Sequence, residues 1–135
     1  MDKKFWITGI VCTLVAFAAG FVVHGLILGV DYKALPNLFR SEADVQNYFP
    51  FMIVAHILIG FAFAWIYRQG ISPGQPWLIQ GVRFGIAVAC LTTIPMFLIY
   101  YAIQPMPGAF VGKQIALDSV ATIVNGVVAA FINKD

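Results

Sequence analysis

Apolar residues gather in four long segments along the chain, and short polar connectors separate them. The four segments cover residues 5–30, 49–67, 84–103 and 111–132. An α-helix rises about 1.5 Å per residue, so about 20 apolar residues cross a hydrocarbon layer roughly 30 Å thick. Each segment is close to that length or longer. The pattern predicts an all-α membrane protein, a single domain over residues 1–135 that folds as an antiparallel bundle of four transmembrane helices.

The connectors hold the residues that end helices. Proline and glycine mark turns at residues 71–76 and 104–108, and both turns are too short to hold a domain. The outer loop, residues 31–48, is the only connector with room for structure. Its Leu35, Leu38 and Phe39 either form a short apolar face on the membrane surface or belong to an ordered loop with no separate role.

Composition argues against a soluble protein. Hydrophobic residues make up 61% of the chain and charged residues 10%, against about 45–50% and about 25% in typical soluble domains. The net charge is only +2 and the basic residues form no stripe, so we expect no nucleic acid partner. The first apolar run continues well past Ala16-Phe17-Ala18, which imitates a signal-peptide cleavage site, and we expect it to be retained as a membrane span.

Basic and aromatic residues at the segment ends predict the orientation, because lysine and arginine collect on the cytoplasmic side. With both termini inside, three basic residues lie outside and five are cytoplasmic, namely Lys3, Lys4, Arg68, Arg83 and Lys134. The three tryptophans then lie at the inner interface and four tyrosines at the outer one, as in aromatic belts. We therefore expect an integral protein of the bacterial cytoplasmic (inner) membrane with both termini in the cytoplasm.

Proline and glycine inside the apolar segments predict local helix geometry. Pro95 lies in the middle of the third segment, where it removes a helical hydrogen bond and is expected to kink the helix. Two glycine pairs, Gly25/Gly29 and Gly81/Gly85, have the spacing that lets helix backbones approach closely in lipid. We interpret both pairs as helix-packing sites.

Ionisable residues inside the segments are the candidates for chemistry, because such groups are costly in lipid and usually face a bundle interior or a cavity. They are His24, His56 and Asp118, and Thr122 and Asn125 continue the Asp118 face at helical spacing. Counted from the outer boundary, the three ionisable residues lie at similar depths of roughly 9–11 Å. They either bond to neighbouring helices as structural groups or form a polar site.

No catalytic signature is present, whether a Walker loop, a dinucleotide-binding glycine motif or HExxH, so we do not expect an enzyme. Three functions are compatible with such a chain. The first is an accessory subunit that stabilises a larger membrane complex, with the lipid bilayer and other membrane protein chains as its partners.

The second function is a b-type haem electron carrier in which His24 and His56 are the axial ligands, since each offers a neutral imidazole nitrogen. Asp118 would then orient a ring N–H or tune the redox potential. The third is a small homo-oligomeric transporter in which Asp118 binds a proton or a cation and Pro95 allows bending. Haem b is thus the one cofactor under consideration, and no metal beyond its iron is expected.

Overall fold

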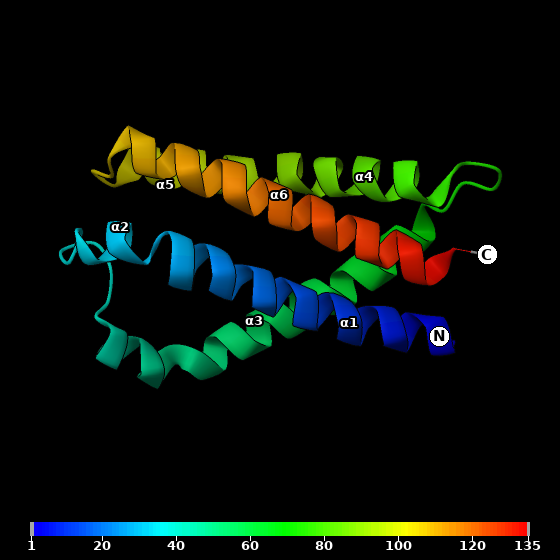
Figure 1. Cartoon of the computed structure of the whole chain (residues 1–135), viewed down its shortest axis with the longest axis horizontal. Coiled ribbons are helices and arrows are strands. Elements are labelled where there is room, and N and C mark those ends of the chain that lie inside the picture. Colours follow the sequence, from blue (N-terminus) through cyan, green and yellow to red (C-terminus); the bar gives the residue numbers. More distant parts are fainter. Residues whose placement is uncertain (1, 135) are drawn as a thin grey trace.

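The computed structural model describes residues 2–134, and every regular element in this range is a helix. The predicted all-helical chain with four segments of membrane-spanning length is confirmed. Both ends of the chain lie at the same end of the molecule (Figure 1). The four segments that are long and apolar enough to cross a membrane are Lys3–Ile27, Glu42–Gln69, Trp77–Ile103 and Gly108–Asn133.

The first long segment changes from an α-helix to a π-helix partway along its length. Asp2 caps its start, because the carboxylate accepts a hydrogen bond from the N–H of Phe5 over 3.0 Å. The regular α-helix then gives way to a wider π-helix, a geometry that is rare and frequent at functional sites. The sequence predicted one regular span over residues 5–30. The elements are α1 (Lys3–Gly20), the π-helix η1 (Phe21–Ile27) and the short α2 (Gly29–Lys33).

The second long helix, α3 (Glu42–Gln69), begins earlier than its apolar run. Ser41 caps it by accepting a hydrogen bond from the N–H of Asp44 over 3.3 Å. Because this cap satisfies a free backbone donor, residues 42–48 join the helix rather than the outer loop predicted from the sequence.

The third and fourth long segments differ in regularity. The third starts at Trp77 rather than at residue 84, and a π-helical turn directly precedes its Pro95. Proline cannot donate a backbone hydrogen bond, which is compatible with the irregular winding before it, and the kink at Pro95 stays a prediction. The elements are α4 (Trp77–Val88), the π-helix η2 (Ala89–Thr93), α5 (Ile94–Ile103) and α6 (Gly108–Asn133).

Glycines bring α4 and α6 into backbone contact. A Cβ placed on Gly85 would lie 2.5 Å from Cα of Ile123, and one placed on Gly81 would lie 2.8 Å from Cα of Val127. The contact is reciprocal, because a Cβ on Gly126 would lie 2.8 Å from the backbone nitrogen of Gly85. Only glycine fits at such distances, so the prediction that Gly81 and Gly85 form a packing site is confirmed.

The other glycine pair does not pack between helices. A Cβ on Gly25 would meet only the ring of Phe21 from the same turn, and one on Gly29 would meet nothing closer than 4.0 Å. The predicted packing site at Gly25 and Gly29 is therefore wrong. Both glycines instead line a cavity, at and just after the π-helical turn.

Residues of the outer loop fold back onto the helices. Leu35, Leu38 and Phe39 pack against one buried apolar cluster, which favours the ordered loop over an apolar face on the membrane surface. This packing covers the end of the molecule opposite the chain termini (Figure 1). The cluster consists of Val23, Leu28, Phe97, Met106, Phe110 and Val111.

Only the part of α3 from Gly60 onward is buried in the bundle. Its buried residues all lie from Gly60 onward, where the rings of Phe63 and Phe84 are 5.2 Å apart. No residue of α3 before Gly60 is buried. Figure 1 shows the first turns of α3 lying away from α5 and α6. This divergence leaves room for a cavity.

Candidate binding site

A cavity of about 1570 Å³ lies between the first half of α3 and the other helices. Most of its walls are apolar side chains, and both π-helical turns contribute to it, His24 from η1 and Thr93 from η2. The structure brings all five polar residues predicted from the sequence to this one cavity. They are His24, His56, Asp118, Thr122 and Asn125.

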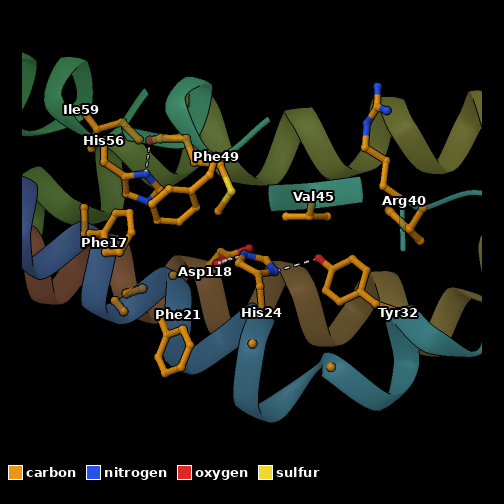
Figure 2. A pocket seen from close by; sticks show the side chains of 18 of the residues that line it. Phe17, Phe21, His24, Tyr32, Arg40, Val45, Phe49, His56, Ile59 and Asp118 are labelled. Carbon is orange, nitrogen blue, oxygen red and sulfur yellow. Dashed lines mark hydrogen bonds and ion pairs between the residues drawn. The ribbon is translucent and has the colours of Figure 1, made fainter. Parts of the chain in front are cut away.

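His24 uses both ring nitrogens to connect three elements. Its Nε2 lies 3.1 Å from Oδ1 of Asp118 on α6, and its Nδ1 lies 2.7 Å from the hydroxyl of Tyr32 on α2. Gln114 of α6 donates an amide N–H to the same hydroxyl over 3.0 Å. Figure 2 shows the imidazole held between Asp118 and Tyr32. These four residues are referred to below as the His24 cluster.

The hydrogen bonds of the His24 cluster are all satisfied by a neutral imidazole with its proton on Nε2. Gln114 donates to the Tyr32 hydroxyl, and in this tautomer the Tyr32 O–H would donate to His24 Nδ1 while the N–H on Nε2 would donate to Asp118. Burial raises the pKa of the Tyr32 phenol above its ordinary value, which keeps this donor protonated. The second carboxylate oxygen of Asp118 has no partner among the described residues.

The polar face of α6 continues along the cavity wall. Thr122 donates its hydroxyl to the carbonyl of Asp118 over 2.7 Å and lies 3.3 Å from the hydroxyl of Thr93. Further along, Asn125 is 2% exposed, and its Oδ1 has no hydrogen-bond partner within residues 2–134. A buried amide oxygen without a partner is uncommon in folded proteins. This oxygen is enclosed by the helices, so a molecule in the cavity does not reach it.

His56 lies on the α3 side of the cavity and takes no part in the His24 cluster. Its Nδ1 donates to the carbonyl of Met52 over 2.6 Å, and its ring packs against Phe17 with the centroids 5.0 Å apart. Its Nε2 lies toward Gly20, where a Cβ would come within 3.3 Å. The sequence predicted similar depths for His24, His56 and Asp118. Of these three residues, His24 and Asp118 contact each other directly, whereas His56 forms a hydrogen bond within its own helix.

Haem ligation by both histidines needs a free ring nitrogen on each. His56 has its Nε2 free of hydrogen bonds, but both nitrogens of His24 are engaged. As arranged, His24 therefore does not fit the role of an axial ligand, since iron would have to displace Asp118 or Tyr32. The described residues hold no group of three or more His, Cys, Asp and Glu side chains that could bind a metal ion.

The haem and transporter functions stay predictions. A sharp Soret band in haem-supplemented protein, lost in His24→Ala and in His56→Ala, would support the haem carrier, and its absence would contradict it. In the transporter, Asp118 would bind the proton or cation. The bound ion would then compete with His24, whose Nε2 lies 3.1 Å from Oδ1 of Asp118.

Two members of the His24 cluster were not identified from the sequence. From the sequence, Tyr32 is one of the four tyrosines of the predicted outer aromatic belt, and Gln114 is not among the predicted polar residues. A signal for Gln114 was nevertheless present, because Gln114, Asp118 and Thr122 recur at intervals of four residues and so share one helix face. No comparable signal pointed to Tyr32, since its contact with His24 depends on the bend between η1 and α2.

Comparison with known proteins leaves the function of this cavity open. The chain matches no protein-family model, no curated protein and no solved structure. The function is therefore argued from the geometry and chemistry of the cavity.

Proposed function

We propose that this chain is a non-enzymatic membrane protein that binds an amphiphilic small molecule in the cavity beside α3. Its four long helices cross the bacterial cytoplasmic membrane as an antiparallel bundle, with both termini in the cytoplasm. The observation that carries the proposal is the cavity itself, in which largely apolar walls carry polar side chains that include His24, Tyr32 and Asp118 of the His24 cluster.

The size and lining of the cavity favour a ligand with a long apolar part. Pockets for drug-sized molecules measure about 300–1,000 Å³, and this cavity is larger, at about 1570 Å³. An apolar chain is as well solvated by lipid as by an apolar pocket, so the apolar walls alone give little affinity inside a bilayer. Selectivity must come from the polar head of the ligand.

The free polar group beside the His24 cluster is a hydrogen-bond acceptor, the second carboxylate oxygen of Asp118, which has no partner among the described residues. The cationic residues of the cavity lining, Lys33 and Arg40, already pair with Glu42 and Asp44. A hydroxyl or amine group on the ligand would satisfy the Asp118 oxygen, and a bond to a carboxylate is roughly twice as strong as one between neutral groups. A fatty acid is disfavoured, because its carboxylate would face that of Asp118. We therefore expect a long-chain alcohol or amine.

Mass spectrometry of the small molecules that stay bound to the purified protein tests this proposal. The wild-type protein should carry an amphiphile with hydroxyl or amine donors. Asp118→Asn should reduce the bound amount about tenfold, because a hydrogen bond to a charged group contributes about 1.5–3 kcal/mol.

Asp31→Asn is the matched control for this experiment. It makes the same chemical change at a carboxylate that pairs with Lys113 at 3.0 Å and does not line the cavity. This variant should retain the ligand at the wild-type level. Equal amounts of the same molecules on wild-type and Asp118→Asn protein would contradict binding at the His24 cluster.

The accessory subunit is the second candidate, and the exposure of α3 favours it. Phe51, Val54 and Leu58, which precede its first buried residue Gly60, are 72%, 55% and 66% exposed. A helix of a partner membrane chain packed there would cover them. Mild extraction should then recover that chain, and Leu58→Trp should reduce its yield, whereas Leu14→Trp on the 63% exposed surface of α1 should not. Equal yields from both variants would count against this surface.

A further inference from the structure

Arg83 on α4 differs from the other two arginines of the chain. Arg40 pairs with Asp44 at 2.8 Å, and Arg68 pairs with Asp2 at 2.6 Å. Within residues 2–134, Arg83 has neither an ion-pair partner nor a hydrogen-bond acceptor. A guanidinium presents five N–H donors in a planar fork that matches two oxygens of a phosphate or carboxylate.

Arg83 also lines a pocket of about 590 Å³ between the end of α3 and the start of α4. It is the one charged residue in that lining. Tyr67 and Ser72 line the same pocket, and their hydroxyls make no hydrogen bond within the described chain. One guanidinium and two hydroxyl groups without partners therefore share a single pocket.

The side chain of Gln80 holds the turn beside this pocket through two hydrogen bonds. The side-chain carbonyl of Gln80 accepts from the N–H of Ser72 over 2.9 Å, and its amide N–H donates to the carbonyl of Gln75 over 2.8 Å. Gly74 supplies the left-handed conformation that the turn needs, with φ of 81°. The pocket is thus formed by two helix ends and a turn whose shape is held by hydrogen bonds.

The distribution of charge favours an anion at this end of the molecule, where α1 begins and α6 ends (Figure 1). Among the described residues it holds one acidic residue, Asp2, against five basic residues. At the opposite end, each of three basic residues pairs with a carboxylate. The excess positive charge therefore lies on the side of the Arg83 pocket. The five basic residues are Lys3, Lys4, Arg68, Arg83 and Lys134.

We propose that the pocket of Arg83, Tyr67 and Ser72 binds an anion of the phosphate class, and that in the membrane this anion is the head group of an anionic lipid. The guanidinium and the two hydroxyls hold the phosphate oxygens, and Ile66 and Phe84 border the apolar part of the lipid. This site is separate from the cavity beside α3 and does not depend on the ligand proposed there.

Native mass spectrometry of the purified full chain with added phosphatidylglycerol or phosphatidylcholine tests the site. The wild-type protein should bind phosphatidylglycerol about tenfold more tightly, and Arg83→Gln should lose this preference. Arg83→Lys should retain part of it, because the charge remains while the fork is lost. Tyr67→Phe, which keeps the ring packed against Phe84 at 5.4 Å, should weaken binding about threefold.

Arg40→Gln is the matched control, because it removes an arginine that is already paired with Asp44 at the opposite end. It should keep the wild-type preference. Inorganic phosphate distinguishes the two sources of the anion: displacement of the lipid by phosphate assigns the site to free phosphate, and retention of the lipid assigns it to the head group. Equal binding of phosphatidylglycerol by wild-type and Arg83→Gln protein would overturn the proposal, as would an equal loss in Arg40→Gln.

Discussion

His24 shares its two ring nitrogens between Asp118 and Tyr32, so η1, α2 and α6 meet at one side chain. Polar groups in an apolar bundle cost free energy unless each donor meets an acceptor. The His24 cluster meets this condition for every ring nitrogen and for the Tyr32 hydroxyl. Oε1 of Gln114 is buried without a partner in residues 2–134, and the second oxygen of Asp118 is the free acceptor on the cavity wall.

Tyr32→Phe should lower the free energy of unfolding in detergent by about 1–3 kcal/mol, because it leaves His24 Nδ1 and the Gln114 amide without their shared partner. Thermal unfolding followed by circular dichroism measures this change. Tyr100→Phe is the control, since Tyr100 is 43% exposed and its hydroxyl bonds to nothing in residues 2–134. A loss of the same size in both variants would mean that the Tyr32 hydroxyl adds no net stability.

At the scale of the helices, small residues decide which pairs pack closely. α4 and α6 approach through Gly81, Gly85 and Gly126, and α1 approaches α3 where a Cβ on Gly60 would meet Thr13. The first half of α3 has no such contact and stays apart from α5 and α6. Close packing at one end of α3 and its absence at the other produce the cavity between them.

Gly85→Leu should destabilise the protein by about 1–3 kcal/mol or more, because the added side chain forces the α4 and α6 backbones apart. Gly29→Leu is the matched control, since a Cβ there meets nothing closer than 4.0 Å. Its midpoint of thermal unfolding should stay near that of the wild-type protein. If Gly85→Leu unfolds at the wild-type temperature, the two helices do not pack through this glycine.

Asp2 ties the start of α1 to the end of α3. Two hydrogen bonds of 2.6 Å from Arg68, together with the bond from the Phe5 N–H, lower the pKa of Asp2 from 3.8 to about 2. A carboxyl group with a lower pKa in the folded state adds stability that is present above about pH 4 and lost as the pH falls toward 2. The difference in stability between wild-type and Asp2→Asn protein should therefore vanish over this range. A difference that is constant from pH 7 to pH 2 would contradict an ionic contribution.

At the scale of the whole molecule, charge is distributed unequally between the two ends. Carboxylates neutralise the basic residues at the loop end, whereas the end with the chain termini keeps an excess of positive charge. Lysine and arginine near span ends are retained on the cytoplasmic side. This distribution is the physical basis for the proposed orientation.

A topology reporter fused after Asp135 should therefore report the cytoplasm, and one inserted near Asn37 should report the outside. Asn37 suits an insertion because it lies in an exposed turn between α2 and α3. The opposite result at either position would reverse the orientation. The Arg83 pocket would then lie in the outer leaflet, and the His24 cluster in the cytoplasmic half.

The sequence by itself predicted an all-helical chain with four segments long enough to span a membrane, which the structure has, and it also indicated the candidate polar residues. A chain with 61% hydrophobic residues in four long runs can satisfy its backbone in lipid only by forming helices or a closed barrel, and runs of about 20 residues select helices. The high cost of ionisable groups in lipid singled out His24, His56 and Asp118. Local hydrogen bonding and side-chain solvation are enough for both conclusions.

Only the tertiary structure decided which of these residues meet. Tyr32 and Gln114 are 82 positions apart in sequence, and a helical periodicity cannot reveal a hydrogen bond between different helices. The π-helical turns at η1 and η2 likewise change which way His24 and Thr93 face, and the glycine contacts of α4 with α6 set the positions of the walls. The cavity exists because α3 is buried only from Gly60 onward, a property of contacts between distant segments rather than of any one segment.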